Sequence, residues 1–433
     1  MNTINRSMFV SLTSNVAGQF LMYLGVILLA RTFSPTEFGE FRYLFNICAV
    51  FNLVVLLGRD AFIIKTRQAK EDFDISYINE FIAGLINTLV IFFVLLFLAL
   101  WFEYAFLSFQ LDKYILCILM ICFWSLANLL IAILKVESKI LTTQVLSNFL
   151  QRSLRFLFFV AVFLFFYNEI INAYYAMVIS QIFFVLILLA FLNGSSRNKL
   201  FEFNIQKVDY KFNFKESSDL FFTTIVIALS LKIDILVLGF ISEWEKVAVY
   251  EIILMLSTIV LLPQIASHKV TEINYINLPH NNILRTNAVD RAIKYAIIPV
   301  SLILIFPEQI LNIFGPDYTV GSRGLVFLSL GYFISIFLGS PFETLMMNGH
   351  TNIGTRILSI QLFIATLLII IFFRLFDLYG LIFSVIVSLL MGKVIARKYC
   401  LNLGLFVNPI NYKLCVITMI FLCMISIIPL LIF

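Results

Sequence analysis

Long apolar blocks separated by short polar segments recur along the whole chain of 433 residues. A helix needs about 20 residues to cross roughly 30 Å of hydrocarbon, and most blocks reach that length. The pattern predicts transmembrane helices near residues 8–30, 41–64, 80–102, 114–134, 146–167, 171–192, 218–241, 247–266, 291–314, 324–347, 355–375, 378–399 and 412–433. We therefore expect an all-α polytopic membrane protein with about thirteen transmembrane helices (12 to 14).

The polar segments between these blocks are short. The longest are 193–217 and 267–290, and both resemble amphipathic connectors rather than folded domains. Composition agrees with a membrane protein: 61% of residues are hydrophobic, 13% are charged and the mean hydropathy is +1.01. Soluble domains carry about 45–50% apolar and about 25% charged residues. The sequence thus excludes an ordinary soluble protein.

Lysine and arginine are distributed unequally between the two sets of loops. With a cytoplasmic N-terminus, the inner loops and adjoining helix ends hold about 22 basic residues and the outer loops about six, and cytoplasmic loops are the ones enriched in such residues. The net charge of +5 largely reflects this bias. We therefore expect the N-terminus to be cytoplasmic and expect no nucleic-acid partner.

Catalytic and metal-binding patterns are largely missing from the sequence. His268, His280 and His350 lack metal-ligand spacing, and neither a metalloprotease motif, a nucleophile elbow nor a phosphate-binding loop occurs. Five of the six cysteines lie in predicted spans, so a disulfide framework is not expected. These patterns favour a protein that is not an enzyme, with no metal or cofactor. Energy for transport would come from a proton or sodium gradient, or from a partner.

Four polar residues of the fifth predicted span share one helix face. Gln144, Asn148, Arg152 and Arg155 follow a spacing of i, i+4, i+8 and i+11. One interpretation is a wet cytoplasmic helix end with arginines reaching lipid phosphates. The other is a lumen-facing basic stripe that attracts an anionic ligand. The length of the span favours this second interpretation, because without these four residues the helix is too short to cross the bilayer.

Charged residues also lie inside other predicted spans. Arg59 and Asp60 are adjacent, and either form a local interfacial ion pair or face a polar interior. Lys232 and Asp234 lie two positions apart, about 200° around a continuous helix, so they cannot both face one partner directly. Lys232 could instead reach the outer interface. Glu251 is a further candidate, with a solvated interfacial position as the alternative.

Four segments resemble, in matching order, the span junctions of a known transporter family. They are Leu28–Ile47, where Arg31 closes the first helix and a Pro-x-x-Phe-Gly turn opens the second; Asp234–Tyr250; Phe314–Phe333, with FG-x-x-Y before a long apolar helix; and Glu343–Ile357. Together they resemble the polysaccharide-transport family of the multidrug/oligosaccharidyl-lipid/polysaccharide exporter (MOP) superfamily, of the O-antigen flippase type.

This resemblance implies two six-helix lobes around a central cavity, an N-lobe over 8–192 and a C-lobe over 218–399, with an extra C-terminal span over 412–433. It also implies a flippase of the bacterial inner membrane that moves an undecaprenyl-diphosphate-linked oligosaccharide by alternating access. Membrane proteins of the same pathway would be further partners. Under this hypothesis the substrate-binding residues are Arg59, Arg152, Arg155 and Lys232, and the residues for ion coupling or charge pairing are Asp60, Asp234 and Glu251.

Three alternatives stay open on the sequence alone. A multidrug cation antiporter shares the architecture but should have an acidic or apolar lumen. A glycan polymerase or ligase should carry a large outer loop, whereas the predicted outer loops here have about ten residues or fewer. A membrane scaffold without transport activity would leave the intramembrane charges unexplained.

Overall fold

The computed structural model describes residues 3–66, 73–105, 111–137, 139–166, 169–192, 214–267 and 282–405. The predicted span over 412–433 and most of the connector over 193–217 lie outside these residues. Throughout the described ranges every regular element is a helix. This agrees with the all-α prediction, because a helix satisfies its own backbone polar groups in hydrocarbon.

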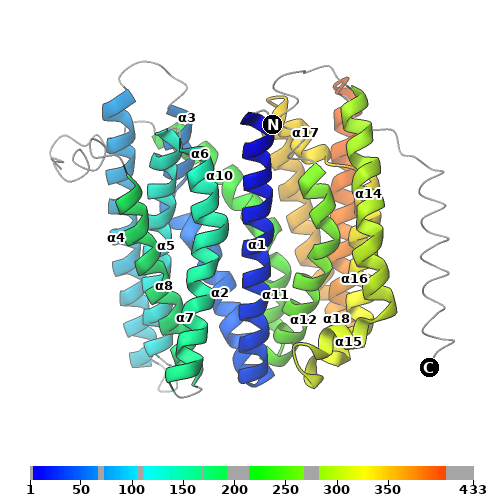
Figure 1. Cartoon of the computed structure of the whole chain (residues 1–433), viewed down its shortest axis with the longest axis horizontal. Coiled ribbons are helices and arrows are strands. Elements are labelled where there is room, and N and C mark those ends of the chain that lie inside the picture. Colours follow the sequence, from blue (N-terminus) through cyan, green and yellow to red (C-terminus); the bar gives the residue numbers. More distant parts are fainter. Residues whose placement is uncertain are drawn as a thin grey trace. The chain divides into compact units, whose positions relative to one another are not determined.

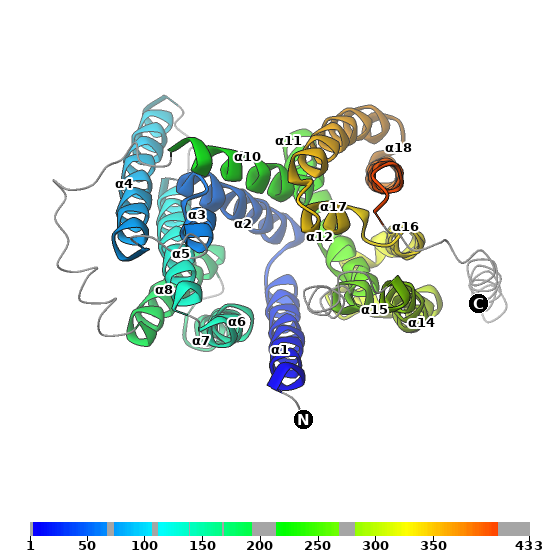
Figure 2. The same cartoon turned by 90° about the horizontal axis from the view of Figure 1, so that it is seen from above.

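The chain divides into two compact units (Figures 1 and 2). Unit 1 comprises Met1–Ser34 and Tyr43–Ala228, and unit 2 comprises Pro35–Arg42 and Leu229–Phe433. The division differs from the predicted lobes in two places. The first turns of α2 belong to unit 2, and most of α10 belongs to unit 1, so the chain changes unit within two helices rather than in a polar connector.

Unit 1 is built around α5, which packs against α4 and α8. Leu129, Leu130 and Ile133 of α5 are fully buried there. Between helices in a membrane such packing acts mainly through van der Waals contact rather than through the hydrophobic effect. The helices with most of their length in this unit are α1 (Thr3–Thr32), α2 (Pro35–Leu56), α3 (Arg59–Thr66), α4 (Phe73–Ala105), α5 (Leu111–Val136), α6 (Ile140–Val145), η1 (Leu146–Leu150), α7 (Gln151–Phe165), α8 (Ile170–Phe191) and α10 (Phe214–Ser230).

One of the predicted spans in this unit is broken, and another has an irregular first turn. The predicted helix over 41–64 breaks between α2 and α3, where Leu57 and Gly58 adopt positive φ angles of 49° and 75°. The predicted helix over 146–167 begins with a π-helical turn, η1. At that turn α1 approaches closely, since a Cβ on Gly18 would lie 1.8 Å from the Asn148 carbonyl oxygen. Glycine is therefore required at position 18.

Unit 2 centres on α16, which packs against α12, α14 and α18. Its helices are α11 (Ile233–Ile241), α12 (Trp244–Ser257), η3 (Thr258–Leu261), α14 (Asn282–Ile305), α15 (Pro307–Asn312), η4 (Pro316–Gly321), α16 (Ser322–Phe337), α17 (Pro341–Met347) and α18 (Thr351–Asn402).

The predicted span over 218–241 is not one straight helix. Its two halves, Phe221–Ser230 and Ile233–Ile241, meet at an angle of 60°. Lys232 lies at the break with φ −133° and ψ −6°. The argument that Lys232 and Asp234 lie about 200° apart on a continuous helix is therefore wrong, because Lys232 precedes the first helical residue of α11. Broken spans are a common way for transporters to bring polar groups to membrane depth.

The 52-residue helix α18 contains the reversal predicted at Phe376-Asp377. Asp377 has a non-helical conformation, with φ 52° and ψ −136°. The reversal is tight, because a Cβ on Gly380 would lie 1.9 Å from the Phe372 carbonyl oxygen. The predicted helices over 355–375 and 378–399 are thus the two halves of α18.

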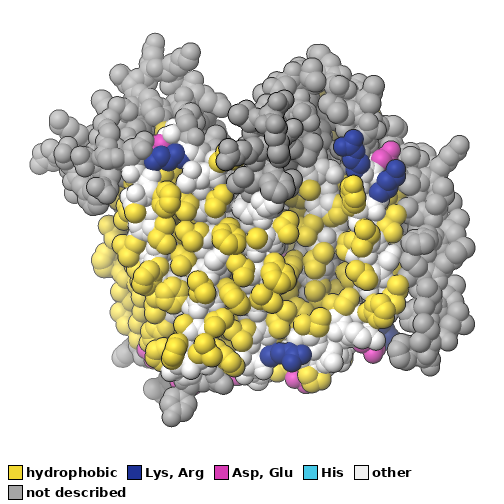
Figure 3. Space-filling model, in the orientation of Figure 1, with side chains coloured by type: hydrophobic (Ala, Val, Ile, Leu, Met, Phe, Trp, Pro, Cys, Tyr) yellow, Lys and Arg dark blue, Asp and Glu magenta, His cyan; other side chains and the backbone are white. Residues whose placement is uncertain are grey.

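The described residues contain nine helices long and apolar enough to cross a membrane, or ten with the bent pair of α10 and α11. The helix α18 counts once among them. Their outer surfaces carry large exposed apolar side chains, such as Phe97 on α4 (67% exposed) and Phe240 on α11 (86%). Figure 3 shows hydrophobic side chains over the middle of the helices and basic ones near helix ends. Such a surface is favourable in contact with lipid tails and unfavourable in contact with water.

Candidate functional site

In unit 1, the polar face of α7 meets an aromatic pair from α2 and α5. Phe45 and Trp124 stack with ring centroids 5.6 Å apart. The Arg155 guanidinium carbon lies 4.8 Å from the Trp124 centroid and 5.5 Å from that of Phe45. Cation–π contact of this kind contributes about 0.5–2 kcal/mol. It fixes the plane of the guanidinium group inside the unit.

Gln181 binds the other side of Arg155, and Gln151 in turn contacts Gln181. Turned so that its oxygen faces Arg155, the fully buried Gln181 amide of α8 accepts a hydrogen bond from Arg155 Nε at 3.1 Å and one from Gln151 Nε2 at 3.3 Å. Arg155 is therefore positioned by both stacking and hydrogen bonding. An interfacial arginine that reaches lipid phosphates would not need such support.

Arg152 lies one helical turn before Arg155 and contacts α1. Its Nη1 donates to Asn15 Oδ1 at 3.4 Å, and the side chain is half buried. Nearby on α2 and α5, Asn128 Nδ2 donates to Asn52 Oδ1 at 2.9 Å. The predicted continuous stripe is altered by the π-helical turn, which changes the register between Asn148 and the two arginines. Arg152 and Arg155 remain on one helix.

Arg59 has a different position from the one predicted for a substrate-binding residue. Its Nη1 forms an ion pair with Glu80 Oε2 of α4 at 2.6 Å, and each side chain is only 1% exposed. A cation so enclosed cannot contact a substrate in this conformation. Glu80 is a partner that the sequence pattern did not indicate, and a role of Arg59 in substrate binding stays a prediction. Asp60, next in the chain, is half buried at the start of α3.

In unit 2, the buried carboxylate of Asp234 lies at the first turn of α11. Tyr250 of α12 donates its hydroxyl proton to Asp234 Oδ2 at 2.6 Å, and the Ile235 amide donates to Oδ1 at 2.9 Å. Both Asp234 and Tyr250 are buried. A carboxylate with two donors in a membrane interior is a candidate for binding a proton or a cation. Lys232, at the adjoining break, is half buried.

A second buried acid follows directly on α12. Glu251 forms an ion pair with Arg42, which belongs to the part of α2 in unit 2, and both side chains are buried. The interpretation of Glu251 as a solvated interfacial residue is therefore wrong. The backbones are also close here, since a Cβ on Gly39 would lie 1.8 Å from the Trp244 carbonyl oxygen. Close approach lets the ion pair form without a water layer.

Comparison with known families identifies the chain. The family model described as "Polysaccharide biosynthesis protein" matches residues 4–267. The chain belongs to this family. A search of the curated proteins gives no match.

Solved structures show that this polysaccharide biosynthesis protein has the fold of MOP superfamily transporters. "Lipid II flippase MurJ, inward closed conformation" is 15% identical and aligns over 97% of this chain and 98% of that chain, with a TM-score of 0.69. An inward-facing MATE family multidrug resistance transporter of the MOP superfamily is 14% identical over 90% and 97%, with a TM-score of 0.68. A MOP superfamily transporter from Pyrococcus furiosus Vc1 is 15% identical over 91% and 93%, with a TM-score of 0.62.

The chain holds further half-buried polar contacts that the sequence did not single out. Lys393 Nζ of α18 donates to the carbonyl oxygen and to Oγ of Ser335, at 3.0 and 3.1 Å. Arg397, four residues later, donates to the Leu338 carbonyl oxygen at 3.3 Å. These cations satisfy carbonyl groups at the end of α16, which favours positive charge. In the described ranges, no group of three His, Cys, Asp or Glu side chains suited to a metal occurs.

Proposed function

We propose that this protein is a flippase that moves an undecaprenyl-diphosphate-linked oligosaccharide, the repeat unit of O-antigen or a related surface polysaccharide, across the bacterial inner membrane by alternating access. The observation that carries the proposal is the positioned pair Arg152 and Arg155 on α7, with Arg155 stacked on Trp124 and bonded to Gln181. Family membership and the fold of MOP transporters support the same function.

The chemistry of this cluster suits the proposed substrate. A diphosphate needs cations inside an apolar protein, and a guanidinium group binds phosphate oxygens through paired N–H donors at its edge. Stacking covers the face of the Arg155 guanidinium and leaves hydrogen bonding to its edge. Sugar rings bind through amide groups, and the half-buried Gln151, one helical turn before Arg155, supplies such a group.

Unit 2 supplies the remaining groups of the proposal. Lys232 lies at the break before α11 and is a second cationic binding site for the diphosphate in this proposal. Asp234 and Glu251 are the candidates for coupling transport to a proton or sodium gradient, with Asp60 as a third candidate in unit 1. The N-terminus is cytoplasmic in this proposal, and other membrane proteins of the polysaccharide pathway would bind at the inner loops.

Replacing Asp234 by asparagine tests the coupling role. Asparagine keeps the size of the side chain and a hydrogen-bond acceptor for Tyr250, but it cannot bind a proton and carries no charge. We expect Asp234→Asn to be produced normally and to lose the dependence of transport on the ion gradient. Transport by this variant that still responds to the gradient as wild type does would exclude Asp234 as the coupling group.

The proposed function predicts what a deletion strain accumulates. Cells that lack the gene should collect lipid-linked repeat units on the cytoplasmic leaflet and lose surface polysaccharide, and the wild-type gene should restore both. Accumulation of flipped single units with a loss of polymer length would instead indicate a glycan polymerase. Normal surface polysaccharide in the deletion strain would contradict the proposal.

A multidrug cation antiporter is the second candidate. The buried acidic groups Asp234 and Glu251 in unit 2 are what such a transporter would use to bind a cation, and MATE transporters share the fold. Cells that overproduce the protein would then tolerate cationic drugs better, and tolerance would fall in the Asp234→Asn variant. Under the flippase proposal, we expect drug tolerance to be unchanged.

A further inference from the structure

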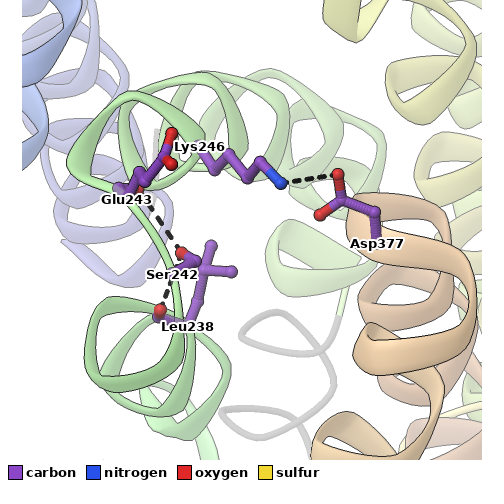
Figure 4. A network of polar contacts seen from close by, with 5 residues as sticks. All are labelled: Leu238, Ser242, Glu243, Lys246 and Asp377. Atoms are coloured by element: carbon purple, nitrogen blue, oxygen red, sulfur yellow. Dashed lines mark hydrogen bonds and ion pairs between the residues drawn. The ribbon is translucent and has the colours of Figure 1, made fainter.

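An open cleft lies where α11 ends, α12 begins and α18 reverses. It has a volume of about 550 Å³, and its lining includes Ile241, Lys246, Arg374 and Asp377. The turn between α11 and α12 forms one wall of the cleft. A hydrogen bond holds this turn against the end of α11, since Ser242 Oγ donates to the Leu238 carbonyl oxygen at 2.8 Å (Figure 4). Asp234 is not among the residues that line this cleft.

The lining of this cleft carries more positive than negative side chains. Lys246 Nζ and Asp377 Oδ2 lie 2.7 Å apart, with side chains 37% and 53% exposed (Figure 4). Lys246 Nζ also lies 5.7 Å from the centroid of the Phe373 ring. Arg374 is exposed in the cleft, and within the described part of the chain it forms no ion pair. Among the residues that line the cleft, two cations therefore face one carboxylate, and the exposed Glu243 lies on the adjoining turn, outside the lining.

The backbone holds these groups in place. Asp377 occupies the reversal of α18 with φ 52° and ψ −136°, a sparsely populated conformation that costs a non-glycine residue about 1–3 kcal/mol. The close approach of Gly380 to Phe372 leaves little freedom for the turn. Arg374 and Asp377 are therefore fixed near Lys246 instead of moving on a long loop.

The walls of the cleft continue into the lipid-facing surface. On α18, Ile371 is 53% exposed and Leu375 is 65% exposed, and both face the surroundings of the helix. Because Arg374 and Asp377 stand at the junction of two membrane-length helices, the cleft lies at the level of the lipid headgroups. A ligand that combines an anion with an apolar tail matches both halves of this surface.

We propose that the cleft binds the headgroup phosphate of an anionic membrane phospholipid. Arg374 is the main contact, and Lys246 is shared between the phosphate and Asp377. The acyl chains lie along the apolar side chains of α18. By the distribution of basic residues in the loops, this is a lipid of the outer leaflet. The site does not depend on the proposed flippase activity, because it requires only that the protein lies in a membrane.

Lipid titration of the purified full-length protein tests this site. The probes are phosphatidylglycerol and phosphatidylcholine, added to the detergent-solubilised protein and counted by native mass spectrometry. We expect Arg374→Gln to weaken phosphatidylglycerol binding on the order of tenfold, as for the loss of one charge-assisted hydrogen bond. Arg323→Gln, which removes an exposed cation at the start of α16, is the matched control and should leave binding unchanged.

Asp377→Asn gives a prediction of opposite sign. Asparagine keeps the size of the side chain but releases Lys246 from its ion pair, so phosphatidylglycerol binding should strengthen several-fold. A purely structural role for this ion pair would not strengthen binding. The proposal is overturned if Arg374→Gln binds phosphatidylglycerol as wild type does, if Asp377→Asn binds it no better, or if phosphatidylcholine binds equally well. Displacement of the lipid by millimolar inorganic phosphate would show a free-anion site and would also overturn it.

Discussion

Cells that carry Arg152→Ala/Arg155→Ala as their only copy are expected to lose surface polysaccharide although the protein is produced at the normal level. Each arginine supplies charge-assisted hydrogen bonds to the proposed diphosphate, worth about 1.5–3 kcal/mol apiece. Loss of Arg155 alone should therefore lower the rate of transport about 10- to 100-fold. The measurement is surface polysaccharide per cell in a strain without its own flippase, normalised to the amount of protein in the membrane.

Two matched variants sharpen this prediction. Arg155→Lys keeps the positive charge but loses the planar fork that stacks on Trp124 and bonds to Gln181. It should recover only a small part of the activity. Arg356→Ala removes the same charge from an exposed position at the start of α18 and should behave as wild type. Full polysaccharide from the double variant would eliminate α7 as a substrate-binding helix.

Breaking the buried ion pair in unit 1 should cause the largest loss of stability. Arg59 and Glu80 are enclosed together, so removing one partner leaves an uncompensated charge. Such a change costs about 3–5 kcal/mol. We expect Arg59→Ala and Glu80→Ala each to lower the unfolding temperature of the purified protein sharply, and to lower its yield in the membrane.

The double variant separates a structural pair from a substrate site. Arg59→Met/Glu80→Leu replaces both charges by apolar groups of similar size and should recover most of the stability, and with it most of the transport. An exposed pair serves as the control, because Lys246→Gln breaks the contact with Asp377 and should cost about 1 kcal/mol or less. If the stable double variant were inactive, Arg59 would belong to the substrate site after all.

The transmembrane helices could be predicted from sequence because apolarity along the chain is a local property. Most predicted spans correspond to helices of the structure, and the reversal at Asp377 lies where the pattern places it. The interruptions could not be predicted in the same way. The break after α2 needs a positive φ at Leu57, which nothing in a leucine indicates. The π-helical turn of η1 and the bend before α11 likewise leave the apolar pattern unchanged.

The partners in the buried ion pairs could not be predicted from the sequence for a different reason. Arg59 pairs with a glutamate 21 positions away, and Arg42 with one 209 positions away. For Arg59, the adjacent Asp60 suggested a local ion pair instead. Position in the chain identified Arg152, Arg155 and Asp234 as residues worth testing, but their partners Trp124, Gln181 and Tyr250 come from other helices. Only the packed fold brings such groups together.

Reconstitution measures the central claim most directly. Purified protein is placed in liposomes with a fluorescent lipid whose diphosphate carries the oligosaccharide, and a membrane-impermeant quencher reports which leaflet holds it. The account predicts protein-dependent translocation that is lost in Arg152→Ala/Arg155→Ala and absent for a glycolipid without the diphosphate. Equal translocation of the two lipids, or none by the wild-type protein under an imposed proton or sodium gradient, would contradict it.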